Sequence, residues 1–278
     1  MTLLNRQAFK HNHAVWIEIF VASNLAFLVL DIYVAHSVNS FHHWTEWIPF
    51  YFALTGAALL FWGMVSSKSL KAGNLRTIGF IVGSCSIIVG IAGLILHLES
   101  NFFQALTLKA LIYSAPFIAP LAFTGLGFLL ILNRMVDHST TVWGKWLAFF
   151  ALGGFAGNFV LSLADHAQNG FFYITEWIPV VSSALAFGFL LTLIIQPLNN
   201  PLKKYGVAII LLQIIVGLLG AAFHIRPLFG EVSDDIFSQV IFGAPVFAPF
   251  LFVDIAVLSA IALWDLHRKS ASPTKVSA

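Results

Sequence analysis

The chain contains eight apolar runs, each close to the length needed to cross a lipid bilayer. They lie near residues 14–36, 45–66, 77–98, 110–134, 143–165, 174–196, 206–225 and 238–264. A helix needs about 20 apolar residues to span the hydrocarbon core, and lipid offers no hydrogen-bond partners to an irregular backbone. The runs therefore predict an all-α integral membrane protein with eight transmembrane helices.

The charged residues predict the orientation of these helices. Only 9% of the residues are charged, against about 25% in soluble domains. Twelve of the 14 Lys and Arg residues fall on one side of the predicted helices, and cationic loops stay preferentially in the cytoplasm. We therefore expect a multi-pass protein of the cell membrane, surrounded by lipid, with both termini cytoplasmic. The net charge of +2 restates this bias, and we expect no nucleic-acid partner.

The sequence is internally duplicated. The pattern His-x-x-Asn-x-Phe-x-x-x-Thr-Glu-Trp-Ile-Pro begins at His36 and recurs 130 residues later at His166. Two further blocks follow in the same order. Ile-Ile-Val-Gly-x-x-Gly-x-x-x-His covers 87–97 and 214–224, and Ala-Pro-x-x-Ala-Pro-x-x-Phe covers 115–123 and 244–252. Three matched blocks in one order indicate a tandem repeat, with a first half at 1–138 and a second at 139–278.

The repeat predicts the symmetry of the fold. Each half holds four predicted helices, and an even number gives both halves the same orientation in the membrane. Parallel repeats of this kind are related by a pseudo-two-fold axis along the membrane normal. The matched blocks all fall toward the extracytoplasmic face.

Six residues of these blocks are candidate metal ligands. Two His and one carboxylate per half form a ligand set that suits iron, copper or zinc. The set consists of His36, Glu46, His97, His166, Glu176 and His224. The alternative interpretation is structural: Thr45 and Thr175 would cap helices, with each Glu stabilised by the helix dipole.

Two glycine pairs accompany the second block. Gly90 and Gly93, repeated as Gly217 and Gly220, lie on the helix face of the following His. Such a smooth surface favours close helix packing. It also suits a flat cofactor, with the neighbouring His residues as axial ligands of a b-type haem. Both interpretations stay open.

The Ala-Pro pairs have two interpretations as well. Proline lacks the backbone N–H, so the pairs either kink one long helix or mark its start at Pro116 and Pro245. In the second case, residues 101–114 and 228–243 would cover the His cluster.

Asp254 breaks the repeat, because Gly125 stands at its place in the first half. A buried acid in a membrane helix is costly and marks a candidate proton or ion site. The alternative is a protonated or hydrogen-bonded Asp.

These features support three functional hypotheses. The first is a transition-metal or b-type haem site that serves electron transfer or oxidation, with a membrane redox partner. The second is a cation- or proton-coupled transporter, and the third is a non-catalytic anchor subunit of a redox complex. No catalytic residue is assigned, and whether the protein is an enzyme stays open.

Overall fold

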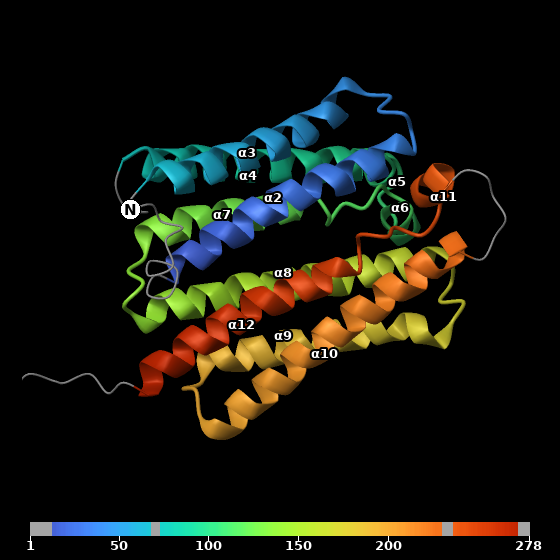
Figure 1. Cartoon of the computed structure of the whole chain (residues 1–278). Coiled ribbons are helices and arrows are strands. Elements are labelled where there is room, and N and C mark those ends of the chain that lie inside the picture. Colours follow the sequence, from blue (N-terminus) through green and yellow to red (C-terminus); the bar gives the residue numbers. More distant parts are fainter. Residues whose placement is uncertain (1–12, 68–72, 230–235, 272–278) are drawn as a thin grey trace, which may run out of the picture. The chain divides into compact units, whose positions relative to one another are not determined.

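The computed structural model describes residues 13–67, 73–229 and 236–271, and within them the chain forms helices and no strand (Figure 1). Seven helices there are long and apolar enough to cross a membrane, and an eighth apolar helix, Leu121–Met135, is shorter. The fold is that of a polytopic helical membrane protein. The count of eight transmembrane helices and the symmetry of the repeat stay predictions.

The chain forms two compact units, one built from residues 1–135 and 221–248 and the other from 136–220 and 249–278. These units differ from the two sequence repeats, because residues 221–248 of the second repeat group with the first. Helix α10 (Asn200–Ile225) therefore contributes to both units.

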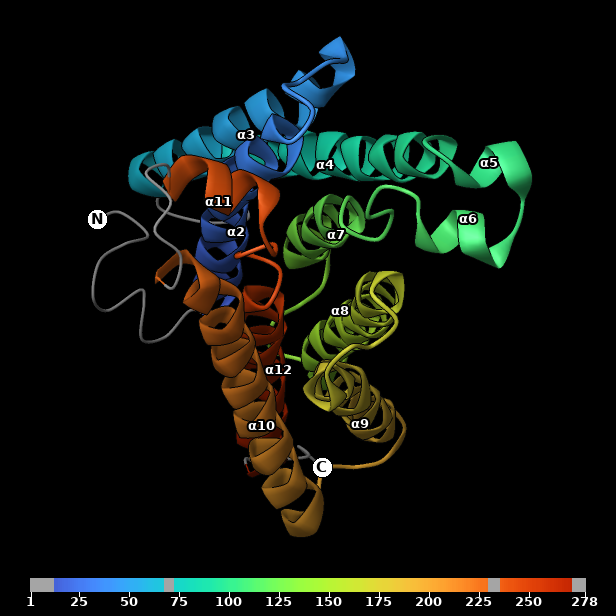
Figure 2. The ribbon, with the colours of Figure 1, turned by 90° about the vertical axis from the view of Figure 1, so that its right-hand side faces the viewer.

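The first unit is a bundle of long helices. Helix α2 (Ala14–Ser37) packs on α3 (Trp47–Ser66) and α7 (Leu121–Met135), and α4 (Gly73–Glu99) packs along α3 and α7. The short helices α5 (Phe102–Ala105) and α6 (Leu108–Ile112) continue from the end of α4 and turn back toward α7 (Figure 2). η3 (Arg226–Phe229) and α11 (Ile236–Phe242) also belong here, and α11 contacts α2.

The second unit centres on α8 (Thr141–Gln168), which packs against α9 (Trp177–Ile195) and α12 (Phe250–Ala271). The short η2 (Ile174–Glu176) leads into α9. Asn199 caps α10, because its side-chain oxygen accepts the N–H of Leu202 at 2.8 Å. The buried Gln213 of α10 donates to the carbonyl of Ser182 on α9 at 3.0 Å and so ties these two helices together.

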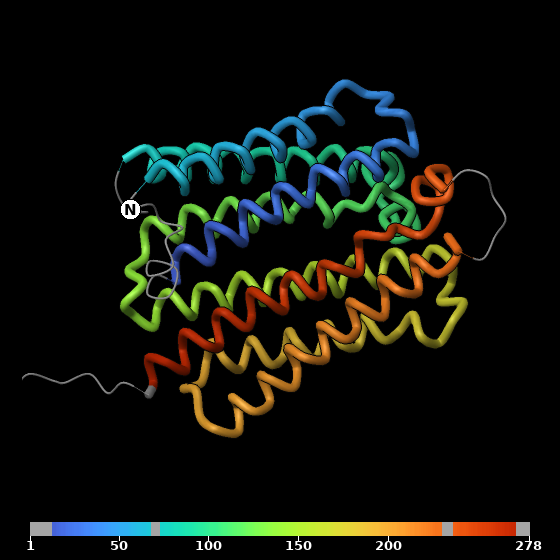
Figure 3. The backbone as a smooth tube through the Cα atoms, in the orientation of Figure 1, coloured from blue at the N-terminus to red at the C-terminus, as the bar shows by residue number. Residues whose placement is uncertain are grey.

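The proline pairs interrupt two of the predicted helices, 110–134 and 238–264. Residues 110–134 are not one helix, since α6 ends at Ile112 and α7 begins at Leu121; likewise α11 ends at Phe242 and α12 begins at Phe250 (Figure 3). Residues Pro116 to Pro120 form single turns instead, because each proline removes a donor that a continuous helix needs. Of the two interpretations, a helix start agrees with the structure, although it lies beyond the second proline.

Reciprocal glycines bring α4 and α7 together. A Cβ on Gly83 would lie 2.9 Å from the carbonyl oxygen of Gly127, and a Cβ on Gly127 would overlap the carbonyl of Gly83. Small residues of this kind allow backbones of membrane helices to approach closely. Ser86 strengthens the contact by donating to the carbonyl of Phe123 at 2.7 Å.

Candidate functional site

The first His–Glu pair lies where α2 ends and α3 begins. Glu46 closes η1 (Trp44–Glu46), and its carboxylate turns back to the end of α2. Oε1 accepts hydrogen bonds from Nδ2 of Asn39 at 3.0 Å and from the backbone N–H of His43 at 3.2 Å. Oε2 lies 3.3 Å from Nδ1 of His36, and the two side chains are only 14% and 21% exposed. A carboxylate and an imidazole are thus held together in a largely buried position.

The second repeat builds the same pair in the other unit. Oε2 of Glu176 lies 3.7 Å from Nδ1 of His166, and Oε1 accepts from Nδ2 of Asn169 at 3.4 Å. In both copies Oε2 of the Glu is buried and has no hydrogen-bond partner among the described residues, although the imidazole is within ion-pair distance. Buried polar atoms are normally satisfied. Each copy therefore keeps a carboxylate oxygen that a ligand or a proton could satisfy.

A tight turn after the His produces this arrangement. The N–H of Phe41 donates to the carbonyl of His36, and that of Ser40 to the carbonyl of Ser37, which is the Schellman pattern of a helix C-terminus. Ser40 and Phe41 have φ values of 58° and 50°. Left-handed backbone is unusual for a bulky residue, and here the Phe41 ring stacks on Trp47 with centroids 4.0 Å apart.

The same turn and stack occur at Gly170 and Phe171. Phe171 has a φ of 54° and stacks on Trp177 at 4.0 Å. Strained backbone that recurs in both copies has to be held by its surroundings, and the aromatic stack provides that support. In both copies, the turn and the aromatic stack thus hold the Glu side chain next to the His side chain.

The other two His residues bind the proline turns. Nδ1 of His97 lies 2.9 Å from the carbonyl oxygen of Pro116, and Nδ1 of His224 lies 2.8 Å from that of Pro245. A carbonyl oxygen can only accept, so Nδ1 carries the proton in both residues. A neutral imidazole in this tautomer presents the lone pair of Nε2, which is the form in which His binds a metal.

Within the first unit, the structure brings two of the predicted ligands into contact. The rings of His36 and His97 lie with centroids 6.2 Å apart, and Glu46 lies beside Nδ1 of His36. Among the residues that the structure describes, however, no three His, Cys, Asp or Glu side chains are grouped closely enough to hold a metal ion. A site made of protein ligands alone would require movement of side chains.

The glycine pairs face the proline turns. A Cβ on Gly93 would lie 2.7 Å from Cβ of Pro120, and one on Gly220 would lie 3.0 Å from Cβ of Pro249. Gly90 and Gly217 border the carbonyls of the same two prolines. Close packing accounts for all four glycines; that they border a cofactor stays a prediction.

Asp254 lies in a different place from that expected. Because α12 begins at Phe250, Asp254 is in its second turn, near the end that the proline turn enters, and is partly exposed. The predicted span 238–264 has Asp254 near its middle, whereas the observed helix has it near its start. A role in binding a proton or an ion stays a prediction.

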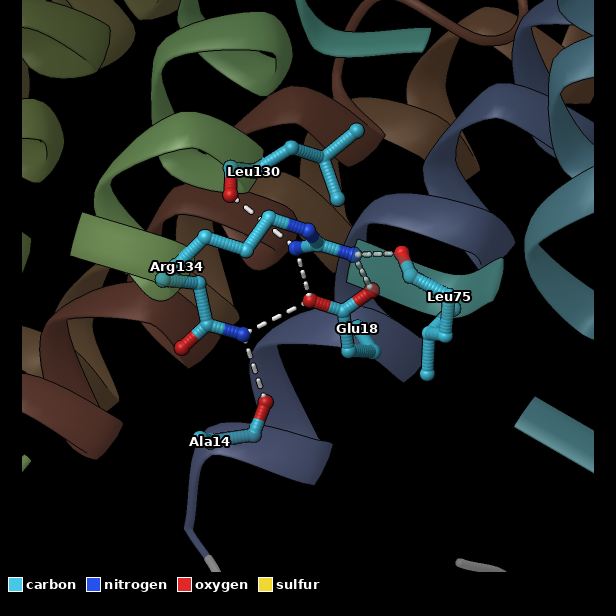
Figure 4. Close-up of polar contacts among 6 residues, drawn as sticks. Ala14, Glu18, Leu75, Leu130 and Arg134 are labelled. Atoms are coloured by element: carbon cyan, nitrogen blue, oxygen red, sulfur yellow. Dashed lines mark hydrogen bonds and ion pairs between the residues drawn. The ribbon is translucent and has the colours of Figure 1, made fainter. Parts of the chain in front are cut away.

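A second polar cluster, which the sequence did not predict, lies at the other end of the first unit (Figure 4). Arg134 makes a two-pronged ion pair with Glu18 at 2.5 and 2.8 Å, and both side chains are fully buried. Arg134 also donates to the carbonyls of Leu130 and Leu75, and Asn133 donates to Glu18 at 2.7 Å.

Sequence reasoning also gave no role to the Asn that fixes each Glu. Asn39 and Asn169 are part of the duplicated block, and their recurrence was the available signal. The Thr residues expected as helix caps do not serve as such: Thr45 bonds the ring of His43, and Glu46 bonds the backbone instead.

Comparison with known proteins found no family model, no curated protein and no solved structure that matches the chain. The functional argument therefore rests on the geometry.

Proposed function

We propose that the first unit binds a b-type haem between His36 and His97, near the extracytoplasmic face, and serves electron transfer in the membrane. The observation that carries the proposal is the state of the His97 ring. The Pro116 carbonyl fixes the proton on Nδ1, which leaves Nε2 as a ligand atom.

His36 supports the same role. Its Nδ1 faces the Glu46 carboxylate, and a ligating imidazole characteristically has a carboxylate or a carbonyl on its other nitrogen. Among the described residues, Nε2 of His36 and Nε2 of His97 have no hydrogen-bond partner. In both rings Nδ1 is thus occupied, by Glu46 in His36 and by the Pro116 carbonyl in His97, which leaves Nε2 to bind a metal.

The spacing of the rings favours haem over a site of protein ligands alone. Two imidazoles on opposite sides of one metal ion have centroids roughly 6 Å apart, because each metal–nitrogen bond is about 2 Å. The observed 6.2 Å agrees with this. Zinc or non-haem iron takes three or more protein ligands, whereas a haem would need only the two imidazoles of His36 and His97 from the protein.

The residues around the rings would tune such a centre. A bound haem supplies one-electron chemistry. If a haem is bound, Glu46 would favour a more basic His36 imidazole, and the negative charge of its buried Oε2 would favour the oxidised form. Asn39 and the Phe41–Trp47 stack hold Glu46 in that position.

The test is a spectrum of the protein purified in detergent from haem-replete cells. We expect a Soret band that shifts on reduction, and pyridine haemochrome analysis should give haem b. His36→Gln and His97→Gln should each lose the haem, because each removes an imidazole nitrogen that would hold it. His42→Gln is the matched control, since His42 is exposed in the same loop.

Full haem content in both His variants would contradict the assignment. Elemental analysis of the same sample completes the test. Wild-type protein without haem and without metal would reject the site and favour the transporter or anchor hypotheses, and zinc or copper without haem would reject the haem.

A further inference from the structure

The buried Glu18–Arg134 ion pair fills a packing site that both repeats possess. In the first unit a Cβ on Gly79 would overlap the Arg134 guanidinium. The matching glycine of the second repeat, 127 positions on, is Gly206, and a Cβ there would lie 2.5 Å from Cζ of Phe189 and 2.8 Å from Cδ2 of Leu263. Leu263 is itself the counterpart of Arg134, 129 positions on. The glycine is thus covered by a guanidinium in the first repeat and by two apolar side chains, Phe189 and Leu263, in the second.

The rest of the cluster is also apolar in the second repeat. Glu18 corresponds to Ala148 and Asn133 to Ala262, and both alanines are fully buried. Well-packed apolar residues often replace a buried ion pair without loss of stability. The helix packing of the second unit, which uses Leu263, shows that this contact does not depend on charge.

The ion pair therefore requires a reason other than stability. Buried polar groups are best attested as devices that fix the register of packed helices. A slip or rotation of α2 would separate Glu18 from Arg134 and leave two buried charges unpaired, whereas an apolar contact tolerates such a shift.

The register of α2 and α4 is what brings the two site imidazoles together. Glu18 and His36 are 18 positions apart on α2, and Gly79 and His97 are 18 positions apart on α4. Eighteen residues make about five full turns, or roughly 27 Å. The ion-pair cluster and the His pair therefore lie on the same faces of the same two helices, at opposite ends.

We propose that Glu18 and Arg134 are positioning residues that hold α2 in the register at which His36 meets His97. The inference deepens the proposed haem function, since it names what aligns the two ligands.

The test measures alignment without any haem. In a Cys85→Ser background, which removes the one native thiol, His36→Cys and His97→Cys place two thiols at the site. Dibromobimane fluoresces only after it joins two thiols, so its rate of fluorescence gain reports their proximity. Because both imidazoles are gone, the result does not depend on the proposed function.

The informative variant is Glu18→Ala with Asn133→Ala and Arg134→Leu, which copies the second repeat and leaves no charge unpaired. We expect the fluorescence rate to fall about tenfold, the factor that corresponds to ~1.4 kcal/mol of lost preference for the native register. Thr55→Val is the control and should change nothing, since the Thr55 hydroxyl bonds only its own helix.

An unchanged rate in a variant that stays monodisperse would overturn the proposal. If that variant aggregates, Arg134→Lys decides, because lysine keeps the charge but loses the two-pronged contact; a rate equal to that of the parent would again overturn it. Loss of cross-linking in a protein that never binds haem would support the positioning role and reject the haem.

Discussion

At the residue scale, the two copies of the turn after the site His differ in one informative position. The first has Ser40 and the second Gly170 at the same left-handed residue, with φ values of 58° and 72°. Glycine adopts this backbone readily, whereas other residues are strained there. The first copy therefore stores strain next to His36 that the second copy lacks.

We expect Ser40→Gly to stabilise the protein by about 1 kcal/mol and Gly170→Ser to destabilise it by a similar amount. Nothing lies within 4 Å of a Cβ at Gly170, so the change acts through the backbone alone. Equilibrium unfolding in detergent measures both. If both substitutions changed the stability in the same direction, the backbone strain at Ser40 would be contradicted.

The individual site residues were only partly predictable. The repeat marked His36, Glu46 and their copies, and the structure pairs each His with its Glu. The sequence repeat could not predict the contact of Glu18 with Arg134, because these residues are 116 positions apart and meet only through the packing of α2 against α7. Contacts of that separation depend on helix register, which apolar patterns do not specify.

At the element scale, the decisive feature is the start of α7. A helix of 15 residues is about 22 Å long, shorter than the hydrocarbon core of about 30 Å. The proline turn at residues 116–120 continues from the start of α7 to His97, whose Nδ1 lies 2.9 Å from the Pro116 carbonyl oxygen. Hydropathy predicted a continuous span over 110–134 because proline and alanine hardly interrupt an apolar run, whereas the missing N–H groups do interrupt the helix.

The close contact of α4 with α7 allows a matched pair of substitutions on one helix. We expect Gly127→Ala to destabilise the protein by about 1–3 kcal/mol through overpacking, because its Cβ would overlap the Gly83 carbonyl. Gly125→Ala should be neutral or slightly stabilising, since nothing lies within 4 Å of a Cβ there. Unfolding in detergent compares the two, and equal stability would exclude a tight contact at Gly127.

At the scale of the whole molecule, the distribution of Lys and Arg predicts that both termini are cytoplasmic and the His end is not. In a Cys85→Ser background, Ser40→Cys should react with a membrane-impermeant maleimide added outside intact cells, and Ser139→Cys should react only after lysis. Both positions are exposed, so access alone separates them. The reverse pattern would invert the orientation.

Residues 221–248 belong to the second sequence repeat but pack in the first compact unit, so the first unit is complete only after most of the chain has been synthesised. The segment that carries α11 packs on α2, and Phe247 meets Phe27 edge to face at 5.2 Å. About 100 residues separate the end of α7 from α11, so at 5–20 residues per second the ribosome needs roughly 5–20 s to deliver it. The face of α2 that contacts α11 and Phe247 therefore gains these contacts only after the intervening helices have been synthesised.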